Sequence, residues 1–245
     1  MEAPGEIIAV DASSRDITPK ILKQYRAKII TVKTGTKALA RQVGVESARK
    51  KYVMFVDSDV KLAEKCLEGL RSDLEASGWA GIQAQVRSWQ NTSYWQRAED
   101  QMFSRSGSRR SVDRITTMAT LFPRRILLQY PFDPNLDAED IELSYRLIRH
   151  GFHLGIASAT AFVYHYHRAD FKAVWQQAYF DGLVSARFGL KYRSLDVFID
   201  PLRAMFSSTL RTVFKGKLWL VPFYLVIWTA CFFGVTAGFS KFYGK

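Results

Sequence analysis

The 245-residue chain has few cysteines and no recognisable secretion signal. Cys66 and Cys231 are the only two cysteines, and they lie in very different sequence contexts. They therefore do not form a disulfide framework, and we expect a reducing compartment. The N-terminal stretch MEAPGEIIAVD has no basic region followed by an apolar run, so we expect no signal peptide. Internal repeats and low-complexity segments are also lacking.

Acidic residues are fewer than basic residues. The 35 lysines and arginines outnumber the 23 aspartates and glutamates, which gives a formal charge of +12 and a pI near 9.7. Such a balance predicts an acidic partner: nucleic acid, anionic lipid or a phosphorylated substrate. No nucleic-acid-binding motif is present, and much of the excess charge lies near the C-terminus and in one loop. A basic nucleic-acid-binding membrane protein stays as an alternative to the interpretation below.

Charge is absent altogether from residues 218–239, LWLVPFYLVIWTACFFGVTAGF. These 22 residues are enough to cross a hydrocarbon layer of about 30 Å as a helix. The alternative is a buried core helix, although soluble helices seldom run this long without a polar face. We therefore predict one C-terminal transmembrane helix over 218–239, followed by a short tail, 240–245.

The flanks of this run indicate its orientation. Four basic residues precede it and two follow it: Arg203, Arg211, Lys215 and Lys217, then Lys241 and Lys245. By the positive-inside tendency, the main domain lies on the cytoplasmic side of a single-pass membrane protein. Residues 186–217 alternate apolar clusters with basic residues at roughly helical spacing, which predicts an amphipathic segment on the membrane surface.

The first third of the chain alternates strand and helix patterns. The strand patterns are EIIAV (6–10), AKIITV (27–32) and YVMFV (52–56), and the last reads as a buried strand. Helical patterns separate them, so we expect a parallel sheet with helices on its faces. Asp11 and Asp57 close two of these strands and are expected at one edge of the sheet.

Two carboxylates follow the third strand, at Asp57 and Asp59. In open α/β sheets ligands lie at the carboxyl ends of the strands. Two hard oxygen donors in that position suit a divalent cation facing a phosphate. The alternative is a polar turn in which Asp59 caps a helix.

Three motifs together resemble a known family. VDASSRD, ALARQVGVESARKKYVMFVDSD and FDPNLDAEDIELSYRLIRHGFHLG are similar to segments of the family 2 glycosyltransferases of the GT-A fold, over residues 6–168. The resemblance implies an α/β domain over 1–185 with a mostly parallel, Rossmann-like sheet and flanking helices. The chain begins at what resembles the second strand of the family, so we expect its first strand, normally internal to the sheet, to be missing.

The resemblance also implies roles for the donor side. Asp11 matches the acidic residue that binds the base of the donor, and Arg41 lies where the family has an arginine near the donor. Asp57 and Asp59 match the D-x-D motif that holds Mg²⁺ or Mn²⁺ on the sugar-nucleotide diphosphate. His165 resembles a late histidine that completes the metal shell, and His167 is its rival.

On the acceptor side, Asp140 matches the catalytic base, although a carboxylate at the start of a helix is also typical of a cap. Glu139, Trp89 and Trp95 are expected to contact the acceptor. A basic loop would hold a phosphate or lie in solvent: Arg105, Arg109, Arg110 and Arg114.

The implied activity is transfer of a sugar from a nucleotide-sugar donor to a membrane-associated acceptor, such as a polyprenyl phosphate or glycolipid. The expected mechanism is a metal-assisted inverting displacement. Because a strand is missing from the expected sheet, a catalytically impaired, truncated homologue is the alternative.

Overall fold

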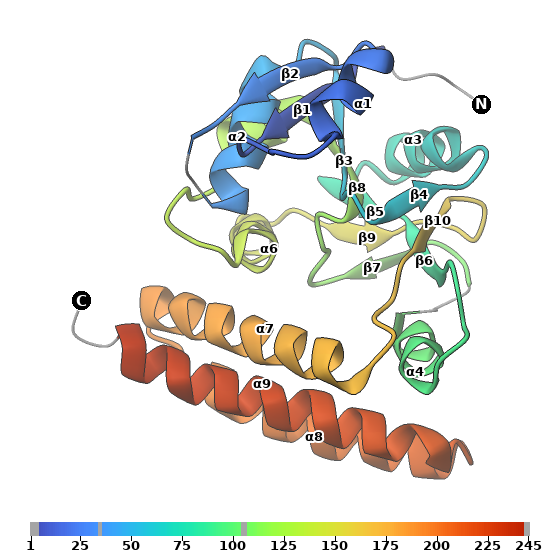
Figure 1. The fold of residues 1–245 in the computed structure, drawn as a ribbon, viewed down its shortest axis with the longest axis vertical. Coiled ribbons are helices and arrows are strands. Elements are labelled where there is room, and N and C mark those ends of the chain that lie inside the picture. Colours follow the sequence, from blue (N-terminus) through green and yellow to red (C-terminus); the bar gives the residue numbers. More distant parts are fainter. Residues whose placement is uncertain (1–4, 34–35, 104–106, 243–245) are drawn as a thin grey trace. The chain divides into compact units, whose positions relative to one another are not determined.

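A computed structural model describes residues 5–33, 36–103 and 107–242 (Figure 1). Arg105 and Lys245 lie outside these residues. The contacts divide the chain into two compact units: unit 1 is Met1–Arg87 with Arg105–His165, and unit 2 is Ser88–Ser104 with Tyr166–Lys245. Unit 2 therefore combines a short internal segment with the whole C-terminal part, which differs from the boundaries expected from the sequence.

Unit 1 begins with the predicted alternation of strands and helices. Its first elements are β1 (Ile8–Asp11), α1 (Thr18–Gln24), β2 (Lys28–Thr31), α2 (Lys37–Ser47) and β3 (Tyr52–Val56). β1 and β2 pair in parallel, as a strand–helix–strand connection requires. The Thr36 hydroxyl caps α2 by accepting the backbone N–H of Leu39.

The remaining strands of unit 1 form two further sheets. Their order is β3-β8-β5-β9-β7 in one and β4-β10-β6 in the other. The strands are β4 (Val60–Leu62), β5 (Gly81–Gln83), β6 (Gln85–Ser88), β7 (Arg110–Val112), β8 (Ala119–Pro123), β9 (Leu154–Ile156) and β10 (Phe162–His165). The helices are α3 (Cys66–Ser77), α5 (Arg124–Gln129) and α6 (Glu139–Arg149).

The direction of the strands corrects the expectation of a mostly parallel sheet. β8 lies between β3 and β5 and runs antiparallel to both, and β7 runs antiparallel to β9. In the described part of the chain, β1 pairs in parallel with β2 and β5 with β9. The fold is thus a mixed α/β arrangement, because short apolar runs such as ATLFP carry no signal for strand direction.

β3 is more exposed than its composition predicts. No residue of YVMFV is fully buried, and Val56 is 45% exposed, whereas β5 is buried throughout. In the described part of the chain, β3 pairs with β8 alone and β1 with β2 alone. Each strand therefore has one open edge among the described residues, and the predicted burial of 52–56 is wrong.

The core of unit 1 fixes the start of α6. Phe122 of β8, Leu154 of β9 and Leu127 of α5 pack with Leu143 and Leu147 of α6 in one buried cluster. Leu143 and Leu147 are four residues apart, so they share the face of α6 that contacts the sheet. The first turn of α6, with its carboxylates, is therefore held at a defined place.

Unit 2 consists of helices. They are α4 (Tyr94–Phe103), α7 (Phe171–Tyr192), α8 (Asp196–Phe214), a 3₁₀ turn η1 (Leu218–Leu220) and α9 (Val221–Phe242). The predicted apolar helix thus begins with a 3₁₀ turn, continues from Val221 and runs three residues beyond Phe239. Pro222 lies in the first turn of α9, where its missing N–H costs no helical hydrogen bond.

Close backbone contacts join α9 to α7. A Cβ atom at Gly182 would overlap the carbonyl oxygen of Cys231, and one at Gly234 would overlap that of Tyr179. Gly238, four residues after Gly234, faces Leu183 in the same way. Small residues at this spacing let two helix backbones approach closely. α9 is therefore packed along α7, with α8 along another side, and is not an isolated helix.

Candidate active site

The two carboxylates of the D-x-D motif lie in the turn between β3 and β4. β4 pairs antiparallel with β10, and the register places His165 opposite Val60. The His165 ring is thereby brought next to Asp59, with 3.3 Å between Nε2 and Oδ2. The imidazole is buried and the Asp59 carboxylate is half exposed, so the pair faces solvent from one side.

The spacing of this pair suits two ligands of one cation. Ligands at about 2.1 Å from an octahedral ion lie about 3 Å apart, close to the 3.3 Å between Asp59 and His165. Asp57 does not belong to this pair, because its Oδ1 accepts a hydrogen bond from Arg41. No group of three or more His, Cys, Asp or Glu side chains placed to hold a metal occurs among the described residues. Asp59 and His165 are thus the two side chains whose spacing suits an ion here, and such an ion would need further oxygens from a ligand or from water.

Arg41 connects the D-x-D motif to α6. Its Nη2 donates to Oδ1 of Asp57 at 2.9 Å, and its Nη1 donates to Oε1 of Glu139. The Arg41 side chain is 12% exposed and that of Glu139 is 6% exposed. Thr117 Oγ1 lies 3.5 Å from the same Glu139 oxygen. Removing one partner of such a buried pair leaves the other charge uncompensated, so the contact holds α2, β3 and α6 together.

These contacts change the interpretation of Glu139. The sequence predicts contact with an acceptor, but the structure gives its carboxylate a buried cationic partner, Arg41. Local sequence patterns carry no signal for this pair, since 98 residues separate its members. An acceptor role stays a prediction, and the geometry favours a structural role.

Asp140, the next residue, is less constrained. It lies in the first turn of α6, is half-buried, and its Oδ1 accepts its neighbour's N–H, that of Ile141, at 2.7 Å. The N-cap position belongs to Ala138, which makes no side-chain cap. Asp140 is thus not the N-cap, although the helix dipole still favours its charge. The two adjacent carboxylates at the start of α6 therefore differ. That of Glu139 is buried in an ion pair, and that of Asp140 is accessible to a reactant.

Asp11 ends β1, as predicted. Its carboxylate accepts hydrogen bonds from the backbone N–H and the hydroxyl of Ser14, which closes a local turn. The helix that carries Arg41 also lies over β1, since a Cβ atom on Gly44 would contact Val10 at 3.6 Å. α2 thus packs against β1 and reaches the end of β3 through Arg41.

Three of the predicted residues belong to unit 2: Trp89, Trp95 and His167. Trp95 packs edge-on against Tyr94 and Phe171 and borders a buried apolar cluster, while Trp89 contacts Tyr166 with 5.7 Å between ring centroids. The buried ring of His167 lies 3.7 Å from Glu99. His165, in contrast, shares unit 1 with Asp59. The acceptor roles of Trp89 and Trp95 stay predictions.

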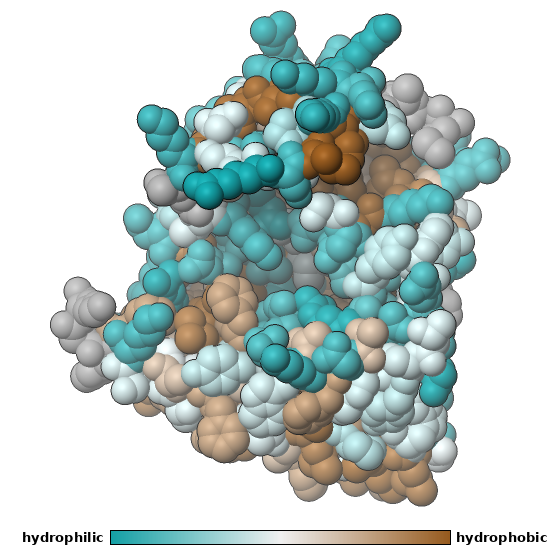
Figure 2. Space-filling view, viewed as in Figure 1, coloured by the Kyte–Doolittle hydropathy of each residue, from teal (hydrophilic) through white to brown (hydrophobic). Residues whose placement is uncertain are grey.

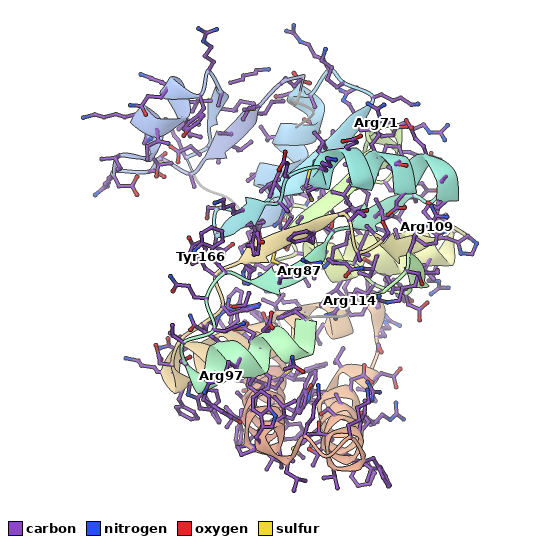
Figure 3. The ribbon with its side chains drawn as sticks, turned by 90° about the vertical axis from the view of Figure 1, so that its right-hand side faces the viewer. Arg71, Arg87, Arg97, Arg109, Arg114 and Tyr166 are labelled. Carbon is purple, nitrogen blue, oxygen red and sulfur yellow. The ribbon has the colours of Figure 1, made fainter. Side chains whose placement is uncertain are left out.

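Part of the basic loop makes contacts within the protein. Arg109 donates to the backbone carbonyl of Asp73 at 3.0 Å and lies over the Trp79 ring, next to α3 (Figure 3). Arg114 is exposed. A phosphate contact by Arg109 would therefore compete with its contacts to α3.

A cysteine such as Cys66, at the start of α3, can act as a nucleophile, but the structure excludes this role for it. Its side chain is buried, and burial raises the pKa of the thiol to about 12. The thiolate is the nucleophilic form of cysteine. Cys66 therefore offers no nucleophile at neutral pH and serves as a core residue.

Comparison with known proteins finds a family model and solved structures of similar fold. A family model described as "Glycosyl transferase family 2" matches residues 3–130, more than half of the chain. No curated protein matches. Among solved structures, GalNAc-T7 with UDP, GalNAc and Mn²⁺ has a TM-score of 0.54 at 14% identity, and the match covers 67% of this chain and 38% of that one.

Another similar structure is Staphylococcus aureus TarS 1–349 in complex with UDP-GlcNAc. Its TM-score is 0.52 at 17% identity, with 71% of this chain and 56% of that chain covered. The present chain thus spans less than two thirds of either protein structure. At such identities the likeness establishes the fold and leaves substrates open.

Proposed function

Because the chain belongs to glycosyl transferase family 2, we propose that it is a membrane-associated glycosyltransferase that moves a sugar from a nucleotide-sugar donor to a lipid-linked or glycolipid acceptor. The observation that carries this proposal is the cluster in unit 1: Asp59 beside His165, and Arg41 bridging Asp57 to the start of α6. A donor site and a candidate base thereby share one framework.

The donor side would depend on charge. Asp59 and His165 would hold Mg²⁺ or Mn²⁺, which would neutralise the negative charge that builds up on a departing nucleoside diphosphate. Arg41 fixes the Asp57 carboxylate in a partly buried ion pair. Asp11, at the end of β1, is the candidate for binding the base of the nucleotide. The UDP and UDP-GlcNAc of the similar structures make uridine nucleotides the first donors to test.

On the acceptor side, Asp140 would accept the proton of an acceptor hydroxyl as that oxygen attacks the sugar. A single base without a covalent nucleophile implies direct displacement, and therefore inversion at the anomeric carbon. Glu139 would act through Arg41 by fixing the first turn of α6, which positions Asp140. An acceptor phosphate, already ionised, would need less help from this carboxylate.

A nucleotide-release screen tests the proposed function. The purified full chain, supplied with Mn²⁺, membranes as acceptor source and a panel of sugar nucleotides, should release nucleotide from one donor class well above the rate without membranes. Donor binding without release would identify an impaired homologue instead. Salt-sensitive DNA binding, with neither donor binding nor release, would favour the nucleic-acid alternative.

Unit 2 supplies the evidence for the membrane. α8 exposes a stripe of large apolar side chains at helical spacing: Ile199, Leu202, Phe206, Leu210 and Val213, with Phe214 beside it. Phe206 is 71% exposed and Phe214 81%. Figure 2 shows apolar surface along the helices of unit 2. Leu218–Phe242 is also long and apolar enough to cross a membrane. Apolar exposure of this extent is typical of helices that contact lipid.

We therefore place α9 across the bilayer, α8 at its surface and the catalytic unit on the cytoplasmic side. Only one of two arrangements keeps the contacts of α9 with α7, which carries Asp181 and Arg187 in its middle part. Either α9 spans the membrane at the cost of these contacts, or the helices lie together in the interface. Charges at the centre of a bilayer are costly, so α7 does not cross with α9.

Carbonate extraction distinguishes the two arrangements. We expect the full chain to stay in the membrane pellet after a carbonate wash, since an integral span does not depend on ionic contacts. Replacing Phe206 and Phe214 by serine should then change little. If carbonate releases the chain, and the two serines weaken its binding further, α8 and α9 lie on the surface and the proposed span is wrong.

A further inference from the structure

Unit 1 has a basic hollow at the end of β3 opposite the D-x-D motif. Five cationic residues line it: Arg49, Lys50, Lys51, Arg124 and Arg125. Pro123 and the 44% exposed Leu128 complete the wall of this hollow, whose volume is about 300 Å³. No acidic side chain lines it. A five-residue strand at about 3.3 Å per residue puts roughly 17 Å between the hollow and Asp57, so the two sites are separate.

Strand pairing brings the two basic segments together. Tyr52 of β3 lies opposite Pro123 of β8, and the backbone N–H of Arg124 donates to the carbonyl of Lys51 at 2.9 Å. The run that precedes β3 therefore meets the run that follows β8. Three consecutive cations from one segment and two from the other converge because the strands are antiparallel.

Other contacts hold this framework in place. Arg124 donates from Nε to the carbonyl of Val45 at 3.1 Å and from Nη2 to that of Glu46 at 3.2 Å. Glu6 accepts the backbone N–H groups of Arg49 and Lys50 on one carboxylate oxygen. That oxygen therefore stabilises the backbone of the basic run. The segments on both sides of the hollow are thus ordered by contacts of their own.

The charges around the hollow are close to one another. Contact with the Tyr52 side chain raises the pKa of the Lys51 ammonium; the nearby Glu75 carboxylate adds to this rise, and the nearby Arg125 opposes it. Lys51 is accordingly charged at neutral pH. Like charges gathered at one concave surface repel each other and create a positive potential that attracts anions. An anion that contacts several of them would relieve the repulsion.

We propose that this hollow binds a phosphate group, separately from the nucleotide-sugar donor. Arginine forks and lysine ammonium groups are the side chains that hold phosphate oxygens. The phosphate belongs either to a small soluble molecule or to a lipid headgroup, whose acyl part would contact Leu128 and Pro123. This site does not depend on the proposed transferase activity, since none of its residues belongs to the candidate active site.

Calorimetric titration of the full chain in detergent tests the site, with inorganic phosphate as the probe. EDTA is present throughout, so that no cation can attract phosphate to Asp59 and His165. We expect saturable binding that weakens with salt. The double variant Arg49→Gln/Arg125→Gln should lose about tenfold or more in affinity, because two charge-assisted contacts are removed.

The matched control is Lys20→Gln/Lys23→Gln on α1, which removes the same charge from exposed positions of the same unit. This control should bind phosphate as the unmodified chain does. Both double variants should keep the melting temperature of the unmodified chain, as the exposed positions of the replaced residues imply. An unmodified chain without saturable binding, or a control that loses as much affinity as the Arg49/Arg125 variant, overturns the proposal.

A second titration with a soluble short-chain phosphatidic acid identifies the source of the phosphate. If the lipid binds more tightly than inorganic phosphate, and Leu128→Ser makes the two affinities equal, the phosphate belongs to a lipid headgroup. Equal binding of both probes, unchanged by Leu128→Ser, assigns a small soluble phosphate. Either result supports the phosphate site if the Arg49/Arg125 variant weakens both probes.

Discussion

Replacing Asp59 by alanine is expected to lower sugar transfer by a factor of about 10² or more, since the charge stabilisation of a bound cation amounts to several kcal/mol. Asp59 is one of the two side chains proposed to hold that cation, and its carboxylate lies 3.3 Å from His165. Its carboxylate is half exposed in a turn, so its removal should leave the folded structure largely unchanged. Turnover with a fixed donor, and the melting temperature of the variant, are the measurements.

Two controls make this result specific. Asp113→Ala removes an exposed carboxylate from the same unit and should keep normal turnover. His165→Ala should resemble Asp59→Ala, and an excess of Mn²⁺ should restore part of its activity because one protein ligand remains. If the unmodified chain keeps its full turnover in excess EDTA, or if Asp59→Ala is fully active, the metal has no part in the mechanism.

The elements that sequence patterns predicted well are those with a local cause. β1, α2 and β3 follow from apolar runs separated by helical spacing. The D-x-D motif could be placed at the end of β3 because that strand stops where the carboxylates begin. The family resemblance implies that His165 or its rival His167 lies near the D-x-D motif, and the pairing of β4 with β10 explains why His165 is beside Asp59.

Features that depend on distant contacts could not be derived in this way. The antiparallel insertion of β8 between β3 and β5 reverses the expected strand direction, and nothing in ATLFP indicates it. Arg41 and Glu139 are each ordinary charged residues in a helical pattern, and only the folded chain pairs them. Likewise, the 218–239 run reads as a lone span, whereas Gly182 and Gly234 pack α9 against α7.

The contrast between the two carboxylates at the start of α6 gives the most direct test of the catalytic assignment. Glu139→Gln removes the buried partner of Arg41 and should lower the melting temperature, because it leaves a guanidinium with one carboxylate in place of two. The turnover of Glu139→Gln should also fall, because the start of α6 loses order. Asp140→Asn should behave differently, since among the described residues the hydrogen bond of the Asp140 side chain is a local one, to Ile141.

For Asp140→Asn we expect an unchanged melting temperature, unchanged donor binding and a turnover that is lower by a factor of about 10² or more with a hydroxyl acceptor. Asparagine keeps the size of the side chain and can accept the Ile141 N–H, but it does not accept a proton at neutral pH. With an acceptor phosphate the loss should be smaller, because the attacking oxygen is already ionised. The size of the effect thus reports on the chemical class of the acceptor. Near-normal turnover with a hydroxyl acceptor would show that Asp140 only stabilises the first turn of α6, and the base would have to be sought among other side chains of unit 1.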